Sequence, residues 1–296
     1  MKQLSYHRKE KMQGLLFITP ALLLFLVFMA YPMIYGLLLS FTSNRNAGSA
    51  LNFNGLSNFI RLFTKDSYFK VSLINNLIYA IGFTPGVLIV ALLVALLLNS
   101  KIRGARLLRT VCFLPYLTSM VAVATVWNIL LAPNGPINSI LRALGISNPP
   151  GWLMDKDWAL PSVILVAIWK NFGYYMIILL AGLQSIPTYL YESALLDGAD
   201  ARQSFRYITL PMLSPTIFLC LITIVIAAFQ EFDIIKIMTE GGPGRATNVL
   251  VFRIYTEGFV NVKMGYASAI AYVLFAIIML ITLFQFWMQK KWVNYD

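Results

Sequence analysis

Six apolar runs, each of about 20 residues or more, constrain this chain more than any other feature. They are residues 15–40, 77–98, 111–131, 160–183, 212–234 and 265–288. A helix needs about 20 apolar residues to cross the hydrocarbon core of a bilayer. Water is absent there, so the backbone must satisfy its own N–H and C=O groups, as a helix does. The sequence therefore predicts an all-α membrane protein with six transmembrane helices.

The composition agrees with an integral membrane protein. The 296 residues are 59% hydrophobic and 12% charged, whereas a soluble domain has about 25% charged residues. The net charge of +11 does not indicate nucleic-acid binding, because no soluble domain with interleaved basic and aromatic residues is present. We therefore expect contact with membrane lipid and no nucleic-acid partner.

Basic residues predict which way the chain crosses the membrane. They gather before the first run, between the second and third runs, and after the last run: Lys2, Arg8, Lys9 and Lys11; Lys101, Arg103, Arg106 and Arg109; Lys290 and Lys291. Loops rich in Lys and Arg stay in the cytoplasm. We expect a cytoplasmic tail over 1–14, a transmembrane domain over 15–288 and a cytoplasmic tail over 289–296, so both termini are cytoplasmic.

A polar segment, residues 185–211, lies between the fourth and fifth runs and is also expected in the cytoplasm. We call it the polar hairpin. Pro187 suits the first turn of a helix, and Gly198 can end that helix in the left-handed conformation. Asp200 and Gln203 have the spacing of a capping box for a second helix. We expect Pro211 to end this second helix before the fifth span.

Two interpretations of the polar hairpin remain open from its pattern alone. An amphipathic hairpin on the inner membrane surface is one. A docking element for a cytoplasmic protein is the other. Its mixed charges and its glycine break favour docking, because lipid binding calls for a bias toward Lys and Arg and needs no such break.

Much of the polar hairpin belongs to a motif that continues a few residues beyond it. The stretch "ESALLDGADARQSFRYITLPMLSP" resembles the EAA loop of ABC importer permeases, the inner-membrane subunits served by an extracytoplasmic binding protein. The matching positions are Glu192, Ser193, Ala194, Gly198, Ile208, Leu210 and Pro211. Ser193 departs from the second alanine of the pattern, a small residue for a small residue. Residues 151–187 and 231–250 resemble the carbohydrate branch of these permeases, of the maltose, glycerol-3-phosphate and multiple-sugar types.

The resemblance implies a fold and a set of partners. The fold is that of a type I ABC importer permease in the bacterial inner membrane, crossing it several times. The EAA loop of that family inserts into a cleft on an ATPase subunit. Glu192 and Gly198 would form the core of this contact, with Ser193, Ala194, Asp197 and Arg202 around them. The implied partners are a second, non-identical permease subunit, two ATP-binding subunits and an extracytoplasmic sugar-binding protein.

The chain has no motif for catalysis of its own. It lacks the Gly-x-x-x-x-Gly-Lys-Ser/Thr phosphate loop and the His-Glu-x-x-His zinc motif, and its only histidine is His7 in the basic tail. We therefore expect a permease that is not an enzyme and binds no cofactor or metal. ATP and magnesium would bind to the separate ATPase subunits.

Two polar clusters inside the apolar runs are candidates for the substrate pathway. Lys170 lies near the middle of the fourth run, where a lysine facing lipid costs about 2.5–3.5 kcal/mol. By resemblance, substrate contacts fall on the fourth and fifth helices, at Asn171, Gly173, Tyr174, Phe229, Gln230 and Asp233. Lys170 joins these candidates because its charge should face away from lipid. Two alternatives stay open: these residues join helices, or Lys170 pairs with Glu231.

The sequence therefore predicts one permease subunit of an ATP-driven carbohydrate importer. We expect an oligosaccharide as substrate, although Lys170 would also suit the phosphate of a glycerol-3-phosphate-like molecule. The alternative is a secondary transporter driven by protons or sodium. Such proteins often contain internal repeats and buried titratable relays, and no repeat is evident in this chain.

Overall fold

The computed structural model describes residues 2–43, 52–100 and 104–293, with side chains from residue 11 onward. Lys101 and Arg103, which contribute to the predicted orientation, lie outside the described residues. The long helices are α1 (Lys2–Phe25), α4 (Ser67–Asn99), α8 (Lys156–Ser185), α11 (Leu210–Phe229) and α14 (Met264–Gln289). The shorter ones are η1 (Leu26–Ala30), α2 (Tyr31–Ser40), α3 (Ser57–Thr64), α5 (Ala105–Leu117), α6 (Met120–Leu130), α7 (Pro136–Ala143), α9 (Thr188–Leu196), α10 (Ala201–Ser204), η2 (Phe205–Thr209), α12 (Asp233–Met238), α13 (Leu250–Tyr255) and η3 (Thr256–Val260).

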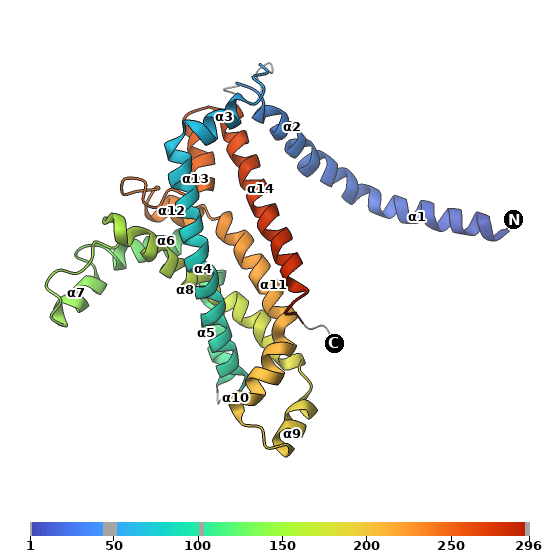
Figure 1. The fold of residues 1–296 in the computed structure, drawn as a ribbon, viewed down its shortest axis with the longest axis vertical. Helices are drawn as coiled ribbons and strands as arrows, with labels where there is room; N and C mark the ends of the chain where they lie inside the picture. Colours follow the sequence, from blue (N-terminus) through green and yellow to red (C-terminus); the bar gives the residue numbers. More distant parts are fainter. Residues whose placement is uncertain (1, 44–51, 101–103, 294–296) are drawn as a thin grey trace. The chain divides into compact units, whose positions relative to one another are not determined.

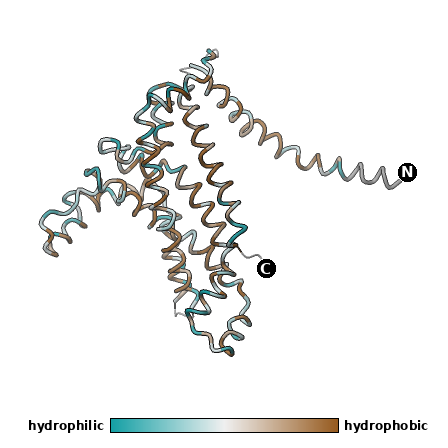
Figure 2. Tube along the Cα trace, in the orientation of Figure 1, coloured by the Kyte–Doolittle hydropathy of each residue, from teal (hydrophilic) through white to brown (hydrophobic). Residues whose placement is uncertain are grey.

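The predicted all-α membrane fold is confirmed. Five continuous helical stretches are long and apolar enough to cross a membrane: Lys11–Ser40, Ser67–Asn99, Lys156–Ser185, Ala201–Phe229 and Met264–Gln289. A bent pair, α5 with α6, makes a sixth span if it is counted as one. Colouring by hydropathy shows the long helices brown along most of their length (Figure 2).

The third apolar run departs from the prediction of a single helix over 111–131. It forms α5 and α6, whose axes meet at 95°. Thr118 and Ser119 between them have extended backbone, with ψ of 148° and 135°. Pro115 lies one turn earlier, where its missing N–H already weakens the helix.

The fifth run departs from the prediction at both ends. We expected Pro211 to end a separate helix, but α10, η2 and α11 continue without a gap. The π-helical turn η2 lets the N–H of Leu210 reach back to Phe205, which accommodates the missing donor of Pro211. At the other end, α11 stops at Phe229, and the residues from Asp233 form the separate helix α12.

The loop after the third run contains the short helix α7 (Figure 1). Pro136 stands at its start, and Gly145 follows its end with a φ of +92°. The N–H groups of Gly145 and Ile146 bond to the carbonyls of Arg142 and Leu141. This is the hydrogen-bond pattern with which a left-handed glycine ends a helix.

The helices form two compact units, residues 1–65 with 254–273 and residues 66–253 with 274–296. In the first unit α14 begins in close contact with the end of α2. A Cβ atom on Gly265 would lie 2.3 Å from the carbonyl oxygen of Thr42, so only glycine fits there. The Asn58 amide also donates to the carbonyls of Ser40 and Thr42, both at 2.8 Å.

In the second unit α4, α8 and α11 lie side by side (Figure 1). α4 meets α8 through glycines: a Cβ atom on Gly86 would lie 2.4 Å from Ile168. Small residues let membrane helices approach closely, which strengthens their van der Waals contact. This unit contains both predicted sites, the polar hairpin and the cluster around Lys170.

Candidate functional site

The polar hairpin has a turn whose geometry is set by its own backbone. Gly198 follows α9 with a φ of +78°. Its N–H donates to the Leu195 carbonyl at 3.1 Å, and the N–H of Ala199 donates to the Ala194 carbonyl at 2.8 Å. These two bonds end α9 at a left-handed glycine. The predicted helix end at Gly198 is confirmed.

The second arm of the hairpin starts at the predicted capping box. The N–H of Gln203 donates to the Asp200 carboxylate at 2.7 Å, and the Gln203 side chain accepts from the N–H of Asp200 at 2.8 Å. The hydroxyls of Tyr191 and Thr209 lie 3.0 Å apart and join the two arms. The turn is therefore held in one shape before any partner binds.

The residues predicted to contact an ATPase lie around this turn. All of them are exposed except Ala194, which is half-buried. The exposed residues are Glu192, Ser193, Asp197, Gly198 and Arg202. Sequence reasoning missed Leu195 and Leu196, which expose 74% and 90% of their surface. These two adjacent leucines, with only Asp197 between them and the glycine break, were the available signal. Large apolar side chains in so polar a segment suit a protein contact.

Lys170 of α8 points its charge at the break between α5 and α6. Its Nζ atom donates to the carbonyls of Thr118 at 2.9 Å, and of Pro115 and Tyr116, both at 3.2 Å. The side chain is only 8% exposed. Among the described residues its hydrogen bonds all go to these carbonyls, and no ion pair joins it to Glu231. The direct Lys170–Glu231 pair is therefore not formed in this structure.

The neighbours of Lys170 on α8 divide into packing and surface residues. Gly173 is buried against α5, where an added Cβ atom would lie 2.1 Å from the Cys112 carbonyl oxygen. The Asn171 amide bonds within its own helix, to the Ala167 carbonyl at 2.8 Å. Tyr174 stacks on Tyr116 with ring centroids 4.7 Å apart. The half-exposed Tyr116–Tyr174 pair is the aromatic surface of this cluster, and sequence reasoning missed Tyr116.

The cluster at the end of α11 does not gather into one pocket. Phe229 is 2% exposed and belongs to the core, whereas Gln230 and Asp233 are exposed. Glu231 lies past the last residue of the span, and burial raises the pKa of its carboxyl. That carboxylate accepts from the N–H of Ile234 and from the Tyr79 hydroxyl, both at 3.4 Å. Glu231 thus supports the start of α12.

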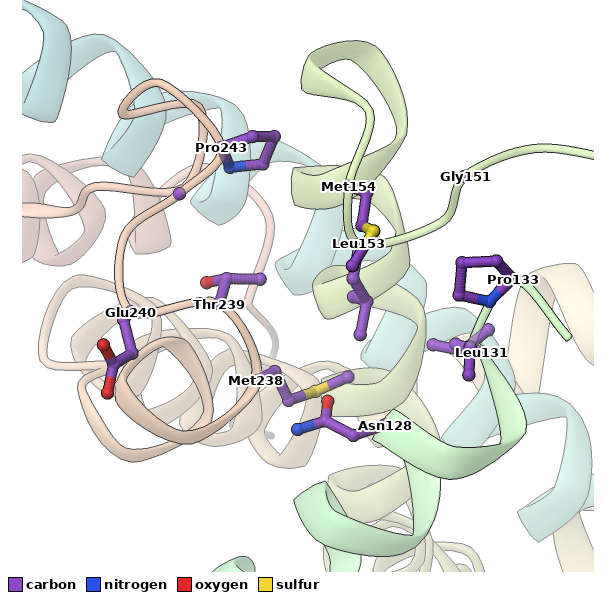
Figure 3. A pocket seen from close by; sticks show the side chains of 12 residues that line it. Asn128, Leu131, Pro133, Gly151, Leu153, Met154, Met238, Thr239, Glu240 and Pro243 are labelled. Carbon is purple, nitrogen blue, oxygen red and sulfur yellow. The ribbon is translucent and has the colours of Figure 1, made fainter. Parts of the chain in front are cut away.

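A separate cavity of about 590 Å³ lies among the loops at the end of α6 and α12 (Figure 3). Its walls are mostly apolar and include Leu131, Met154 and Met238. The polar groups in its lining include Asn128 and Glu240. The Asn128 Oδ1 atom is buried and accepts no hydrogen bond from any described residue. This cavity shares no lining residue with the Lys170 cluster.

Comparison with known proteins identifies the kind of molecule that carries these features. The family of binding-protein-dependent transport system inner membrane components matches residues 87–294. The chain belongs to this family. The match includes the polar hairpin, the Lys170 cluster and the bent pair of helices.

Relatives of the chain align with it over nearly their full length. The lactose transport system permease protein of Rhizobium radiobacter is 36% identical, over 97% of each chain. An sn-glycerol-3-phosphate transport system permease protein of Agrobacterium fabrum is 34% identical, again over 97% of each chain. A bacterial alginate ABC transporter, solved with an alginate pentasaccharide-bound periplasmic protein, contains a chain with a TM-score of 0.84, 25% identity and 98% coverage of each.

The comparisons confirm the predicted permease family and its fold. This binding-protein-dependent permease is a multi-pass protein of the bacterial inner membrane. It is not itself an enzyme, and the ATPase is a separate subunit. The alternative of an ion-coupled secondary transporter is wrong, since the relatives belong to ABC systems.

Proposed function

We propose that this permease subunit forms half of the pathway through which an ATP-driven importer takes up a carbohydrate, in the form of an oligosaccharide. The relatives at this level of identity carry lactose and glycerol-3-phosphate, and the structural neighbour carries alginate. A second, non-identical permease subunit supplies the other half. An extracytoplasmic sugar-binding protein delivers the substrate, as the periplasmic protein in the alginate complex indicates.

The polar hairpin is the observation that carries the coupling part of this proposal. Its turn is prearranged by a left-handed glycine and a capping box, and it presents two exposed leucines beside charged residues. A rigid, partly apolar knob suits insertion into a cleft on another protein, because little conformational freedom is lost on binding. Two ATP-binding subunits holding ATP and magnesium are the proposed partners. The hairpin and both termini then lie in the cytoplasm.

The Tyr116–Tyr174 pair is the proposed contact for the sugar. Aromatic faces pack against the apolar face of a sugar ring, and neighbouring polar groups such as Asn171 and Gln230 bond to its hydroxyls. Lys170 is not suited to bind a substrate phosphate, because its donors are already used by three carbonyls. This favours a neutral sugar over a glycerol-3-phosphate-like molecule.

Uptake of a panel of labelled sugars by a strain lacking this chain tests the substrate class. We expect at least one oligosaccharide to enter only when the chain is restored. Its uptake should stop when cellular ATP is depleted and continue when an uncoupler collapses the proton gradient. If no carbohydrate depended on the chain, the substrate class would be wrong.

A further inference from the structure

The break between α5 and α6 exposes backbone groups that a membrane helix normally hides. The last four carbonyls of a helix have no partner within it. At the end of α5 this affects Tyr116 and Pro115, although the Pro115 carbonyl also accepts from the Thr118 hydroxyl at 2.6 Å. Thr118 adds a third carbonyl from the extended link. All three lie inside the apolar run 111–131, where lipid offers no hydrogen bond. Irregular backbone at such a depth persists only where protein or trapped water satisfies it.

Lys170 satisfies these carbonyls as a cation. Its Nζ atom lies 2.9–3.2 Å from three carbonyl oxygens. An ammonium group has three N–H donors, whereas a neutral amine would have only two for these three acceptors. The carboxyl end of a helix also favours a positive charge, because the helix dipole is negative there. The geometry is that of a charged side chain capping a broken helix.

α8 also contacts both arms of the break on either side of Lys170. The Trp169 and Trp127 rings meet edge to face, with centroids 5.5 Å apart, which joins α8 to α6. Gly173 lies against the Cys112 backbone, which joins α8 to α5. Three contacts within five residues of one helix thus fix the bend from both sides.

We propose that Lys170 is a positioning residue that holds α5 and α6 in their bent arrangement, and that transport depends on this arrangement rather than on contact between Lys170 and substrate. The part concerning transport rests on the proposed function. The part concerning the bend does not, because it depends only on contacts within this chain.

Spin labels on the two arms measure the bend directly. Leu107 on α5 and Ile129 on α6 are exposed and far from Lys170 in sequence. They are replaced by cysteine for labelling in the assembled transporter, after Cys112 and Cys220 are changed to serine. Pulsed electron–electron double resonance then gives the distribution of distances between the two spin labels, one on each arm. We expect one narrow distance distribution when Lys170 is present.

The variants Lys170→Met and Lys170→Arg separate charge from side-chain size. Methionine removes the ammonium from all three carbonyls and leaves those of Tyr116 and Thr118 without a donor, whereas Pro115 keeps the Thr118 hydroxyl at 2.6 Å. We therefore expect a clearly broadened distribution. The maximal uptake rate of the sugar identified by the panel should fall by at least about tenfold, with little change in KM. The guanidinium of arginine supplies donors and charge, so Lys170→Arg should keep the narrow distribution. If Lys170→Met fails to assemble, Lys170→Gln, which is neutral and one atom shorter than lysine, is expected to broaden the distribution as well.

Asn171→Ala is the matched control, because this amide bonds only within its own helix. We expect it to leave the distance between the arms unchanged. A narrow distribution in Lys170→Met or Lys170→Gln would overturn the proposal, and so would equal broadening in Asn171→Ala. A raised KM with an unchanged distance would make Lys170 a substrate contact instead. If no sugar is transported, the proposed function fails while the distance measurement still tests the bend.

Discussion

Gly198 is the single residue on which the shape of the polar hairpin most depends. Its φ of +78° lies in the left-handed region, and a Cβ atom added there would meet no other atom within 4 Å. We predict that Gly198→Asp lowers uptake at least about tenfold. The added side chain has room in this chain, so the loss comes from contact with the ATPase. The amount of ATPase subunit that co-purifies with the tagged permease measures this contact.

Gly145 provides the control for backbone strain. It ends α7 with a φ of +92° and also has open space at its Cβ position. An L-residue at either site costs about 1–2 kcal/mol in backbone strain. Gly145→Asp should therefore match that cost and still retain the ATPase. Equal loss in both variants would assign the effect of Gly198→Asp to strain alone.

Leu196 exposes 90% of its surface at the end of α9. An apolar side chain that is buried only in a complex stabilises that complex by about 1.5–3 kcal/mol for a leucine. We predict that Leu196→Ser weakens the affinity of the permease for the ATPase by about tenfold or more, without lowering the amount of folded permease. Titration of purified ATPase against reconstituted permease measures the affinity.

The corresponding control is Leu144, which exposes 75% of its surface directly before the left-handed Gly145. Leu144→Ser should leave ATPase affinity unchanged. An unchanged affinity in Leu196→Ser would remove the leucine from the proposed contact.

For single residues, the sequence predicted where a side chain lies better than it predicted what that side chain contacts. Polarity inside an apolar run correctly placed Lys170 away from lipid, since burying a charge demands a partner. It did not reveal that the partners are backbone carbonyls more than 50 positions away. Gly173 likewise came from a motif, but its contact with Cys112 depends on how two helices cross, which no local pattern encodes.

At the scale of elements, the contact between α8 and α5 depends on the absence of a side chain. An added Cβ atom at Gly173 would lie 2.1 Å from the Cys112 carbonyl oxygen and 3.0 Å from the Cα atom of Phe113. Both obstacles are backbone, so the helices must move apart. We predict that Gly173→Ala destabilises the permease by about 1–3 kcal/mol, which thermal unfolding of the complex in detergent measures.

Gly36 serves as the comparison within another span. An added Cβ atom there meets only a ring atom of Tyr272, at the ordinary contact distance of 3.7 Å. Gly36→Ala should change the unfolding temperature little or raise it, because alanine favours the helix by about 1 kcal/mol. A fall as large as that of Gly173→Ala would mean that the tight contact with α5 is not the cause.

The long helices and the polar hairpin followed from hydropathy and local capping signals, whereas the bend between α5 and α6 and the π-turn η2 did not. Hydropathy located all six apolar runs, since length and composition decide whether a helix can span. It cannot show a bend, because α5 and α6 together have the composition of one straight helix. The π-turn η2 was also missed: Pro211 is a reliable helix breaker only when the preceding turn cannot rearrange.

At the scale of the molecule, Asn76 joins three helices of the second unit. Its amide donates to the Ala228 carbonyl at 3.3 Å at the end of α11, and its oxygen accepts from the N–H of Leu250 at 3.1 Å at the start of α13. The residue is fully buried. We predict that Asn76→Ala costs about 1–3 kcal/mol, because two buried backbone groups lose their partners.

Thermal unfolding of the assembled transporter measures this loss. Asn99, exposed at the other end of α4, is the control, and Asn99→Ala should shift the unfolding temperature little. Equal stability of both variants would show that water or other groups replace the Asn76 amide.

The length of α8 determines how far its ends would move if the helix tilted. The helix runs without interruption through 30 residues, and two residues separate its end from α9. Lys170 has 14 helical residues before it and 15 after it. At a rise of 1.5 Å per residue, each side of Lys170 is about 21–23 Å long. Lys170 thus lies near the middle of α8, with nearly equal lengths of helix on either side. A tilt of about 10° around it would move the two ends by about 4 Å in opposite directions.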